Sequence, residues 1–256
     1  MKALLLAAGF GTRLRPITDS IPKCLVPVAG RPLMSYWLEI LLKGKVISEI
    51  IINTHYLSKA VEKYVAENEY RGLIELVHEI RLLGTAGTVQ SILPKIKKGD
   101  LFVAHADNLT MFDLGAFVER HQRRPKNCIA TMMTFATDNP QSCGIVRLDE
   151  QGVVKDFHEK VQNPPGNLAN AAVFILSPEA LDIIAKLKKQ ETLDISVDVL
   201  PLLMGRLYTY HNDIYHRDIG TQESLSAADI EFPKIYQNYI SRNFVNENTR
   251  HGGLRL

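Results

Sequence analysis

The sequence lacks the features that mark secreted, membrane-spanning and nucleic-acid-binding proteins. Its 256 residues contain three scattered cysteines and no CxxC pair, so we expect no disulfide framework and a reducing, cytoplasmic location. The apolar run at residues 3–8 is too short for a secretion signal, and no run approaches the roughly 18 residues of a membrane span. The formal net charge of +2 argues against a general role on nucleic acids or membrane surfaces.

Uninterrupted apolar runs give the main indication of the fold. Each run is consistent with a strand that is buried on both faces. They occupy residues 3–8, 50–52 and 101–104, and residues 74–78 are predicted to form a further strand. Residues 32–42 carry apolar side chains at helical spacing, and Ser58 is a candidate N-cap for a helix that runs to about residue 67. This alternation predicts an α/β protein with a doubly wound, mostly parallel sheet.

A glycine-containing loop follows the first predicted strand. Gly9 and Gly11 allow backbone N–H groups to approach an anion closely, while Arg13, Arg15 and Lys23 add positive charge. In open α/β sheets, ligands bind beyond the carboxyl ends of the strands, where this loop lies. The loop is therefore a candidate phosphate-binding segment, although its glycine spacing alone fits a structural turn equally well.

Single positions exclude two common nucleotide-binding motifs. The dinucleotide fingerprint requires a third glycine where this sequence has Leu14. The Walker loop requires Gly-Lys-Ser/Thr, whereas Gly11 is followed by Thr12 and Arg13. If the loop binds phosphate, it does so in a different kind of site.

A longer pattern around this loop resembles a known family. It has the form G-x-G-T-R-L-x-P-x-T, followed by Pro22-Lys23 and L-x-P-V, with Cys24 where many relatives carry proline. The pattern is similar to the signature of the nucleotide-sugar pyrophosphorylases, which are nucleoside triphosphate:sugar-1-phosphate nucleotidyltransferases. The resemblance implies a Rossmann-like nucleotidyltransferase fold with a smaller acceptor-binding β subregion. It also implies that the loop from Gly9 to Lys23 holds the triphosphate.

The resemblance further implies which residues contact the nucleotide. In the family, the Leu-Gly-Thr-Ala-Gly segment found here at residues 83–87 lies against the base and its sugar, and Glu79 is expected to position it. The same residues, considered alone, predict a turn that opens a helix. The nucleotide-binding residues implied by the family are Ala8, Gly9, Gly11, Thr12, Gly84 and Gly87.

Two aspartates match the magnesium-binding positions of the family. Asp107 follows the strand predicted at residues 101–104, and Asp218 opens an Asp-Ile-Gly-Thr motif. The sequence alone favours a turn-capping role for Asp107. His105-x-Asp107 is also compatible with a transition-metal site, but no third ligand has suitable spacing. The resemblance implies that Asp107 and Asp218 bind Mg²⁺, with His105 and His216 departing from the residues usual in the family.

A second group of matches implies the acceptor site. A hairpin predicted over residues 143–154 precedes Glu159 and Lys160, and Asn170 follows. In the family, the glutamate and the asparagine hold sugar hydroxyls and the lysine holds the sugar phosphate, whereas a Glu-Lys pair is usually only surface charge. Ala172 replaces the glycine of the family's Asn-Ala-Gly, so we expect a different fit to the sugar.

We expect one catalytic domain over residues 1–232. Its nucleotide half covers about residues 1–110, and its sugar-binding half covers about residues 111–232. A helix is predicted from residue 223 to 230, and the polar residues 233–256 are predicted to form an appended C-terminal tail.

The implied reaction joins two phosphates that already carry negative charge, so the main barrier is electrostatic and orientational. Arg13 and Lys23 are the expected catalytic residues. Arg13 can clamp the β- and γ-phosphates with a planar fork of donors, and Lys23 supplies a point charge near the α-phosphate. No general base is required, because the attacking phosphate oxygen is already an anion.

The substrates are expected to be a nucleoside triphosphate and a sugar-1-phosphate, with Mg²⁺ as cofactor. The product would be a nucleotide sugar of the kind used for cell-envelope or polysaccharide precursors. Residues 6–9 resemble those of uridylyl-transferring relatives, and this resemblance slightly favours UTP over GTP. Two alternatives stay open: a non-catalytic regulatory homologue that binds sugar nucleotides, and the same chemistry on a non-sugar alcohol phosphate. Homo-oligomerisation is also left open.

Overall fold

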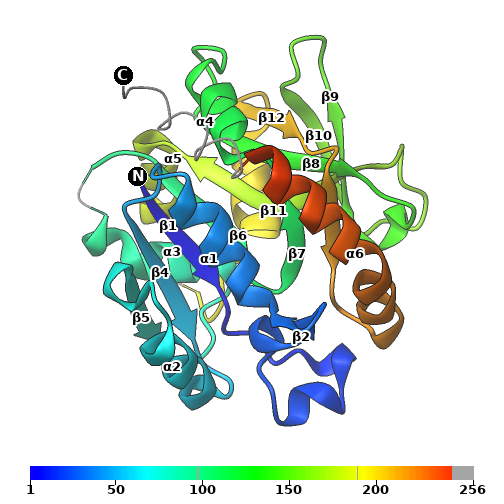
Figure 1. Cartoon of the computed structure of the whole chain (residues 1–256). Coiled ribbons are helices and arrows are strands. Elements are labelled where there is room, and N and C mark those ends of the chain that lie inside the picture. The colour runs from blue at the N-terminus through cyan, green and yellow to red at the C-terminus, as the bar shows by residue number, and fades with distance from the viewer. Residues whose placement is uncertain (97, 189, 244–256) are drawn as a thin grey trace, which may run out of the picture.

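The half of the chain that is predicted to bind the nucleotide is built on four parallel strands. The computed structural model describes residues 1–96, 98–188 and 190–243. The strands are β1 (Lys2–Leu6), β4 (Glu49–Thr54), β5 (Ile74–His78) and β6 (Leu101–His105), and they lie in the order β5-β4-β1-β6 (Figure 1). The chain adds β4 and β5 on one side of β1 and then returns to add β6 on the other side. In such sheets, ligands usually bind in the crevice beyond the carboxyl ends of the two strands where the order reverses, here β1 and β6.

The second half extends the same sheet with mainly antiparallel neighbours. It adds β8 (Ala130–Ala136), β9 (Gly144–Leu148), β10 (Val154–Glu159), β11 (Leu168–Leu176) and β12 (Leu207–His211). Strand β11 pairs with β6 and β8 in antiparallel fashion, β12 runs parallel to β8, and β9 and β10 form the predicted hairpin. The α/β sheet predicted from the apolar runs is therefore confirmed, and it is parallel across its nucleotide half.

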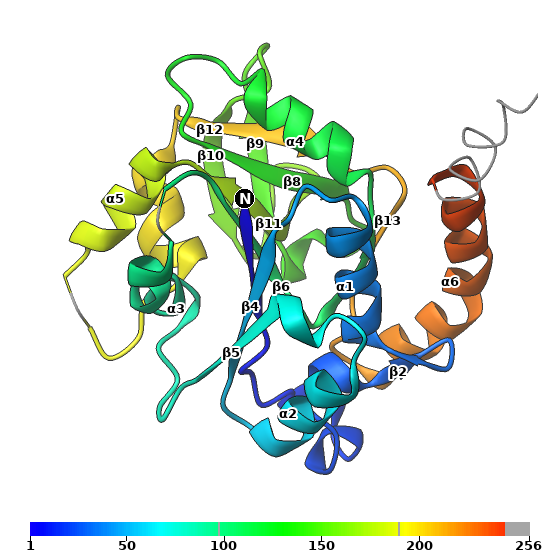
Figure 2. The ribbon, with the colours of Figure 1, turned by 60° about the vertical axis from the view of Figure 1, so that its left-hand side comes forward.

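Helices cover both faces of the sheet (Figure 2). On one face lie α1 (Leu33–Lys43), α2 (Ser58–Glu67), α4 (Leu114–Gln122) and α6 (Gln222–Asn243), and on the other lie α3 (Thr85–Ile92) and α5 (Pro178–Lys186). Leu57, and not Ser58, occupies the N-cap position of α2. In β1, Ala3 and Leu5 pack into the first layer, while Leu4 and Leu6 pack into the second. Burial on both faces explains why residues 3–6 of β1 form an uninterrupted apolar run.

A separate two-stranded ribbon joins distant parts of the chain. Strand β7 (Asn108–Met111) pairs antiparallel with β13 (Tyr215–Asp218), and Asn108 lies opposite Asp218. Since Asn108 directly follows Asp107, this register brings the two predicted magnesium ligands to the same end of the ribbon.

Helix α6 corrects the predicted C-terminal boundary. The helix continues through Pro233 to Asn243, so the prediction of an appended tail is wrong for residues 233–243. The Tyr236 hydroxyl donates to Glu39 Oε2 on α1 at 2.6 Å, and the Tyr239 hydroxyl donates to the Phe112 carbonyl at 3.1 Å. These contacts fasten the end of α6 to the domain. Residues 244–256 of the predicted tail lie outside the described residues.

The remaining elements are short. A two-stranded hairpin is formed by β2 (Pro27–Val28) and β3 (Arg31–Pro32). The short helical turns are Thr12–Leu14, Ile17–Asp19, Lys23–Leu25, Arg71–Leu73, Leu93–Lys95, Pro140–Ser142, Ile195–Val199 and Leu200–Leu203. Within the described part of the chain, none of the helices combines the length and the apolar character needed to cross a bilayer.

Candidate active site

The two predicted metal ligands meet at a buried lysine. Lys23 Nζ donates to Asp107 Oδ2 and to Asp218 Oδ1, each at 2.9 Å. The Lys23 side chain is 7% exposed, whereas those of Asp107 and Asp218 are 34% and 47% exposed. Each residue comes from a different segment: Lys23 from the turn Lys23–Leu25, Asp107 from the turn between β6 and β7, and Asp218 from the end of β13. The structure thus brings together three of the predicted site residues.

The protonation states in this cluster follow from burial and charge. Burial by itself lowers the pKa of Lys23, but Asp107 and Asp218 outweigh it, and the pKa lies above its ordinary value. Burial by itself raises the pKa of Asp107, but Lys23 and His105 outweigh it, and the pKa lies below its ordinary value. Lys23 is therefore an ammonium and Asp107 a carboxylate at neutral pH.

Arg13 completes the cluster from the phosphate loop. Its Nη2 donates to Asp218 Oδ2 at 3.1 Å. A Cβ atom on Gly220 would lie 2.9 Å from Arg13 Nη2, so a glycine at 220 leaves room for the guanidinium. The arginine side chain is 66% exposed and can reach a ligand in front of the loop.

The cluster fits a magnesium site. Asp107 and Asp218 direct carboxylate oxygens at one cation, here the ammonium of Lys23, and Mg²⁺ is commonly bound by one or two carboxylates together with substrate phosphates. Among the described residues, no group of three or more His, Cys, Asp or Glu side chains could hold a metal ion. The residues around His105 therefore do not form the transition-metal site considered above.

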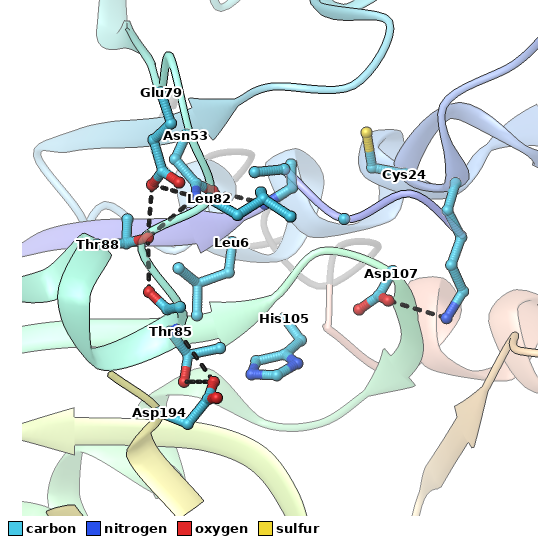
Figure 3. A pocket seen from close by; sticks show the side chains of 15 residues that line it. Leu6, Cys24, Asn53, Glu79, Leu82, Thr85, Thr88, His105, Asp107 and Asp194 are labelled. Atoms are coloured by element: carbon cyan, nitrogen blue, oxygen red, sulfur yellow. Dashed lines mark hydrogen bonds and ion pairs between the residues drawn. The ribbon is translucent and has the colours of Figure 1, made fainter. Parts of the chain in front are cut away.

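A cavity of about 240 Å³ opens beside this cluster (Figure 3). Ala8 and Gly9 of the phosphate loop line it, together with Lys23 and Asp107 at one end. Cys24 also lines it, but burial and the nearby Asp107 raise the pKa of its thiol to about 12, so it stays protonated. The predicted contacts Gly11 and Thr12 do not line this cavity. Gly11 has a φ of +65° and its carbonyl accepts from Thr18 Oγ1, so this glycine shapes the loop.

Asn53 and Glu79 form the buried wall of the cavity at its other end. Asn53 Oδ1 accepts from the Ala7 backbone N–H at 2.7 Å, and Asn53 Nδ2 donates to Glu79 Oε1 at 2.9 Å. Glu79 also accepts from Thr88 Oγ1 at 2.5 Å and from the Leu83 backbone N–H at 3.2 Å. Glu79 positions the 83–87 segment as expected. Asn53 was not predicted, although its place at the carboxyl end of β4 was a usable signal.

The two glycines of the 83–87 segment differ in role. Gly84 lines the cavity at a φ of +77°, and a Cβ atom there would lie 2.4 Å from the Leu193 carbonyl oxygen. Gly87 does not line this cavity; it packs against Leu83 and Leu193 behind the segment. Of the two glycines, the structure thus places Gly84 at the cavity and Gly87 behind it.

Asp194 is a further polar group in the cavity that sequence reasoning missed. Its Oδ1 accepts from the backbone N–H of Thr85 at 3.3 Å and from Thr85 Oγ1 at 3.1 Å. In Figure 3, Asp194, Thr85 and His105 lie together, on the side away from Glu79. The sequence gives no sign of this contact, because Asp194 and Thr85 are 109 positions apart.

A second cavity, of about 510 Å³, begins at Asp218 and Arg13. His216 lines it and packs against Phe135 with the two rings tilted, at 4.2 Å between ring centroids. Burial lowers the pKa of His216 to about 4, so the ring is neutral at pH 7. Cys143 lines the far part of the same cavity.

The predicted acceptor residues gather at the edge of the second cavity without lining it. Glu159 on β10 pairs with Gly144 on β9, and the pairing of β11 with β9 brings Asn170 to the same place. The Lys160 backbone N–H donates to the Cys143 carbonyl at 3.2 Å, and its ammonium lies 3.4 Å from Glu159 Oε1. Ala172 has a φ of +54°, a conformation that favours glycine, at a bulge in β11.

Comparisons with known proteins identify relatives of this chain. A Mycobacterium tuberculosis mannose-1-phosphate guanylyltransferase is 30% identical over 235 residues, covering 89% of this chain and 64% of the relative. A Xenopus laevis mannose-1-phosphate guanyltransferase beta-A is 32% identical over 227 residues, covering 86% of this chain and 61% of the relative. This chain thus spans less than two thirds of either relative.

Solved structures share the fold. A putative glucose-1-phosphate thymidylyltransferase from Bacillus anthracis superposes with a TM-score of 0.79 at 24% identity, covering 90% of this chain and 94% of that chain. HddC from Yersinia pseudotuberculosis, solved with GMP-PN, gives a TM-score of 0.75 at 23% identity, covering 90% and 99%. The nucleotidyl transferase family profile matches residues 2–234. With this match over most of its length, and with the Lys23–Asp107–Asp218 cluster beside the loop from Gly9 to Lys23, the chain belongs to the nucleotidyl transferase family.

Proposed function

We propose that this protein transfers a nucleotidyl group from a nucleoside triphosphate to a sugar-1-phosphate in a Mg²⁺-dependent reaction. A phosphate oxygen of the sugar-1-phosphate forms a bond to the α-phosphorus, the bond from that phosphorus to the bridging oxygen breaks, and pyrophosphate leaves with the electron pair. The observation that carries the proposal is the convergence of Lys23, Asp107 and Asp218, with hydrogen bonds of 2.9 Å, beside the phosphate loop.

The residues of the chain act by orientation and charge. Arg13, on the exposed side of the loop, can bind the leaving β- and γ-phosphates with two parallel donors. When the substrates bind, the Lys23 ammonium moves away from its two carboxylate partners and neutralises negative charge at the α-phosphate. Asp107 and Asp218 would then hold Mg²⁺, which supplies further neutralisation of phosphate charge. Lys160 lies at the edge of the second cavity, where it can balance the charge of the incoming sugar phosphate.

We propose GTP and mannose-1-phosphate as the substrates to test first. The relatives from Mycobacterium tuberculosis and Xenopus laevis are named as mannose-1-phosphate guanylyltransferases, so they do not support the UTP preference expected from residues 6–9. Retention of Arg13, Lys23, Asp107 and Asp218 favours catalysis over a purely regulatory role, because function resides in the site and not in the fold.

Pyrophosphate release tests the proposal. The four common nucleoside triphosphates are combined with mannose-1-phosphate, glucose-1-phosphate and an alcohol phosphate, each with and without Mg²⁺. We expect the highest turnover with GTP and mannose-1-phosphate, and loss of turnover when EDTA removes the metal. Absence of turnover in every combination, with retained binding of nucleotide sugars, would instead establish the regulatory alternative.

Matched variants identify the residues involved. We expect Asp107→Asn and Asp218→Asn each to lower kcat by roughly 100-fold or more, the scale of lost transition-state charge stabilisation. Asp182→Asn, on α5 and outside both site cavities, is the control and should retain full activity. Near-normal kcat in Asp107→Asn would refute the metal assignment.

A further inference from the structure

The turn that follows β4 contacts the phosphate loop through aromatic rings. Phe10, between the two loop glycines, packs against Tyr56 and His55 with ring centroids 5.4 Å and 5.6 Å away. Phe10 is nevertheless 42% exposed, so its ring is held from one side only. Its neighbour Gly9 lines the nucleotide cavity, and movement of Phe10 would therefore move the cavity wall.

Tyr56 supports the same loop through a second route. Its hydroxyl donates to the Thr18 carbonyl at 2.9 Å, and Thr18 Oγ1 in turn donates to the Gly11 carbonyl at 2.8 Å. Thr18 is fully buried, and a Cβ atom on Gly11 would lie only 2.9 Å from Thr18 Cγ2. Tyr56 therefore fixes the loop at Phe10 and at Gly11.

The adjacent residue, His55, holds the opposite side of the cavity. His55 Nδ1 lies 2.7 Å from the Glu79 carbonyl oxygen. A carbonyl only accepts, so Nδ1 carries the proton and donates. The Glu79 side chain binds the Leu83 backbone N–H, directly before Gly84 at the cavity wall. His55 thus fixes the position of the loop that reaches from Glu79 to Gly84.

We infer that His55 and Tyr56 are positioning residues that set the distance between the phosphate loop and the loop from Glu79 to Gly84. Neither residue lines the cavity, yet one turn fixes both of its sides. Triphosphate binding and base selection are therefore coupled through this turn. The inference rests on the proposed binding of a nucleoside triphosphate in the cavity.

Equilibrium binding of GTP and of UTP to the full chain, measured by calorimetry, tests the coupling without relying on turnover. We expect Tyr56→Phe, which keeps the ring and removes the hydroxyl, to weaken GTP binding about fivefold, as for one ordinary hydrogen bond. Because Tyr56 touches only the phosphate side, the decisive readout is the ratio of GTP to UTP affinity. We expect this ratio to change by about fivefold, at the low end of typical coupling between sites.

His55 provides the complementary test. We expect His55→Ala to change the GTP affinity and the ratio of GTP to UTP affinity as Tyr56→Phe does. His55→Asn should restore both quantities, because the asparagine amide nitrogen can donate from nearly the position of Nδ1. Tyr70→Phe, beyond the far end of α2, is the matched control and should behave as the wild type. Thermal unfolding verifies that each variant is folded, and Tyr56→Phe carries the test if His55→Ala does not fold.

The outcomes separate the inference from the proposed function. Wild-type affinities in both Tyr56→Phe and His55→Ala overturn the inference, as does weaker binding with an unchanged ratio of GTP to UTP. A wild-type chain that binds neither nucleoside triphosphate overturns the proposed function, and the inference with it.

Discussion

Replacing Lys23 by methionine removes the ammonium between Asp107 and Asp218 while keeping most of the apolar stem. Lys23 makes two charge-assisted hydrogen bonds at 2.9 Å, and each such bond is worth about 1.5–3 kcal/mol in a buried setting. The carboxylates are 34% and 47% exposed, and Asp218 keeps Arg13 as a partner, so solvent and Arg13 offset much of this loss. We expect the free energy of unfolding to fall by about 2 kcal/mol, or Tm by about 4–8 °C for a chain of this size.

The pH dependence of the Lys23→Met effect follows from Asp107. Burial opposes ionisation of this carboxyl, but Lys23 and His105 hold its pKa below the ordinary value of 3.8. A depressed pKa contributes stability above pH 3.8, and this contribution is lost as the pH falls through the pKa of the folded state. The difference in stability between wild type and Lys23→Met should therefore be full at pH 7 and should shrink below pH 3.8.

Three measurements verify this prediction: thermal unfolding from pH 3 to pH 8, pyrophosphate release, and thermal unfolding with added Mg²⁺. We expect kcat to fall roughly 100-fold or more. Mg²⁺ should stabilise Lys23→Met more than the wild type, because the two carboxylates have lost their ammonium. Lys59→Met, at a 90% exposed side chain on α2, is the control and should change stability by less than about 0.5 kcal/mol. An unchanged Tm together with a kcat within tenfold of the wild type would refute the reasoning.

Three further predictions concern the frame of the site. Gly84→Ala should destabilise the protein by at least about 2 kcal/mol in urea unfolding, because the new Cβ atom would overlap the Leu193 carbonyl at a positive φ; Gly72→Ala, which meets nothing within 4 Å, is the control. Ala172→Gly should stabilise the protein by about 0.5 kcal/mol, because the backbone strain removed at a φ of +54° exceeds the cost of the greater conformational entropy that glycine gives the unfolded chain. A loss of stability above about 1 kcal/mol would contradict this. Burial raises the pKa of Glu39, but hydrogen bonds from Lys43, Tyr236 and Arg31 outweigh it and bring it below 4.5. Glu39→Gln should therefore lower Tm above pH 4.5 and lose this effect as the pH falls below that value, whereas a constant difference would argue against the assignment.

The fold was largely predictable because its central strands are buried on both faces. Residues 50–52 and 101–104 can be apolar throughout, since alternate side chains enter opposite layers. The end of α6 was mispredicted because Pro233 is normally a helix breaker. Phe232, Tyr236 and Tyr239 nevertheless recur at helical spacing, and their packing against α1 and the Phe112 carbonyl extends the helix beyond the proline.

The site was predictable where one strand end or one continuous motif carries the chemistry. Asp107 and Gly84 are of this kind. Asp194 could not be predicted, because only the folded chain brings it to Thr85. Gly87 was assigned to the nucleotide because it belongs to the same short motif as Gly84, whereas the first turn of α3 directs it toward Leu193. A short motif thus identifies a segment, while the helix that it opens decides which of its residues line the cavity.

The Lys23 bridge has a consequence for synthesis of the chain. Lys23 and Asp218 are 195 positions apart, so at roughly 5–20 residues per second Asp218 is made about 10–40 s after Lys23. During that interval, Asp107, only 84 positions from Lys23, is the first of the two carboxylates to become available. A ribosome-bound chain that ends before β13 therefore contains only Asp107 of the two carboxylates that bind the Lys23 ammonium. The complete cluster requires nearly the whole domain to be synthesised.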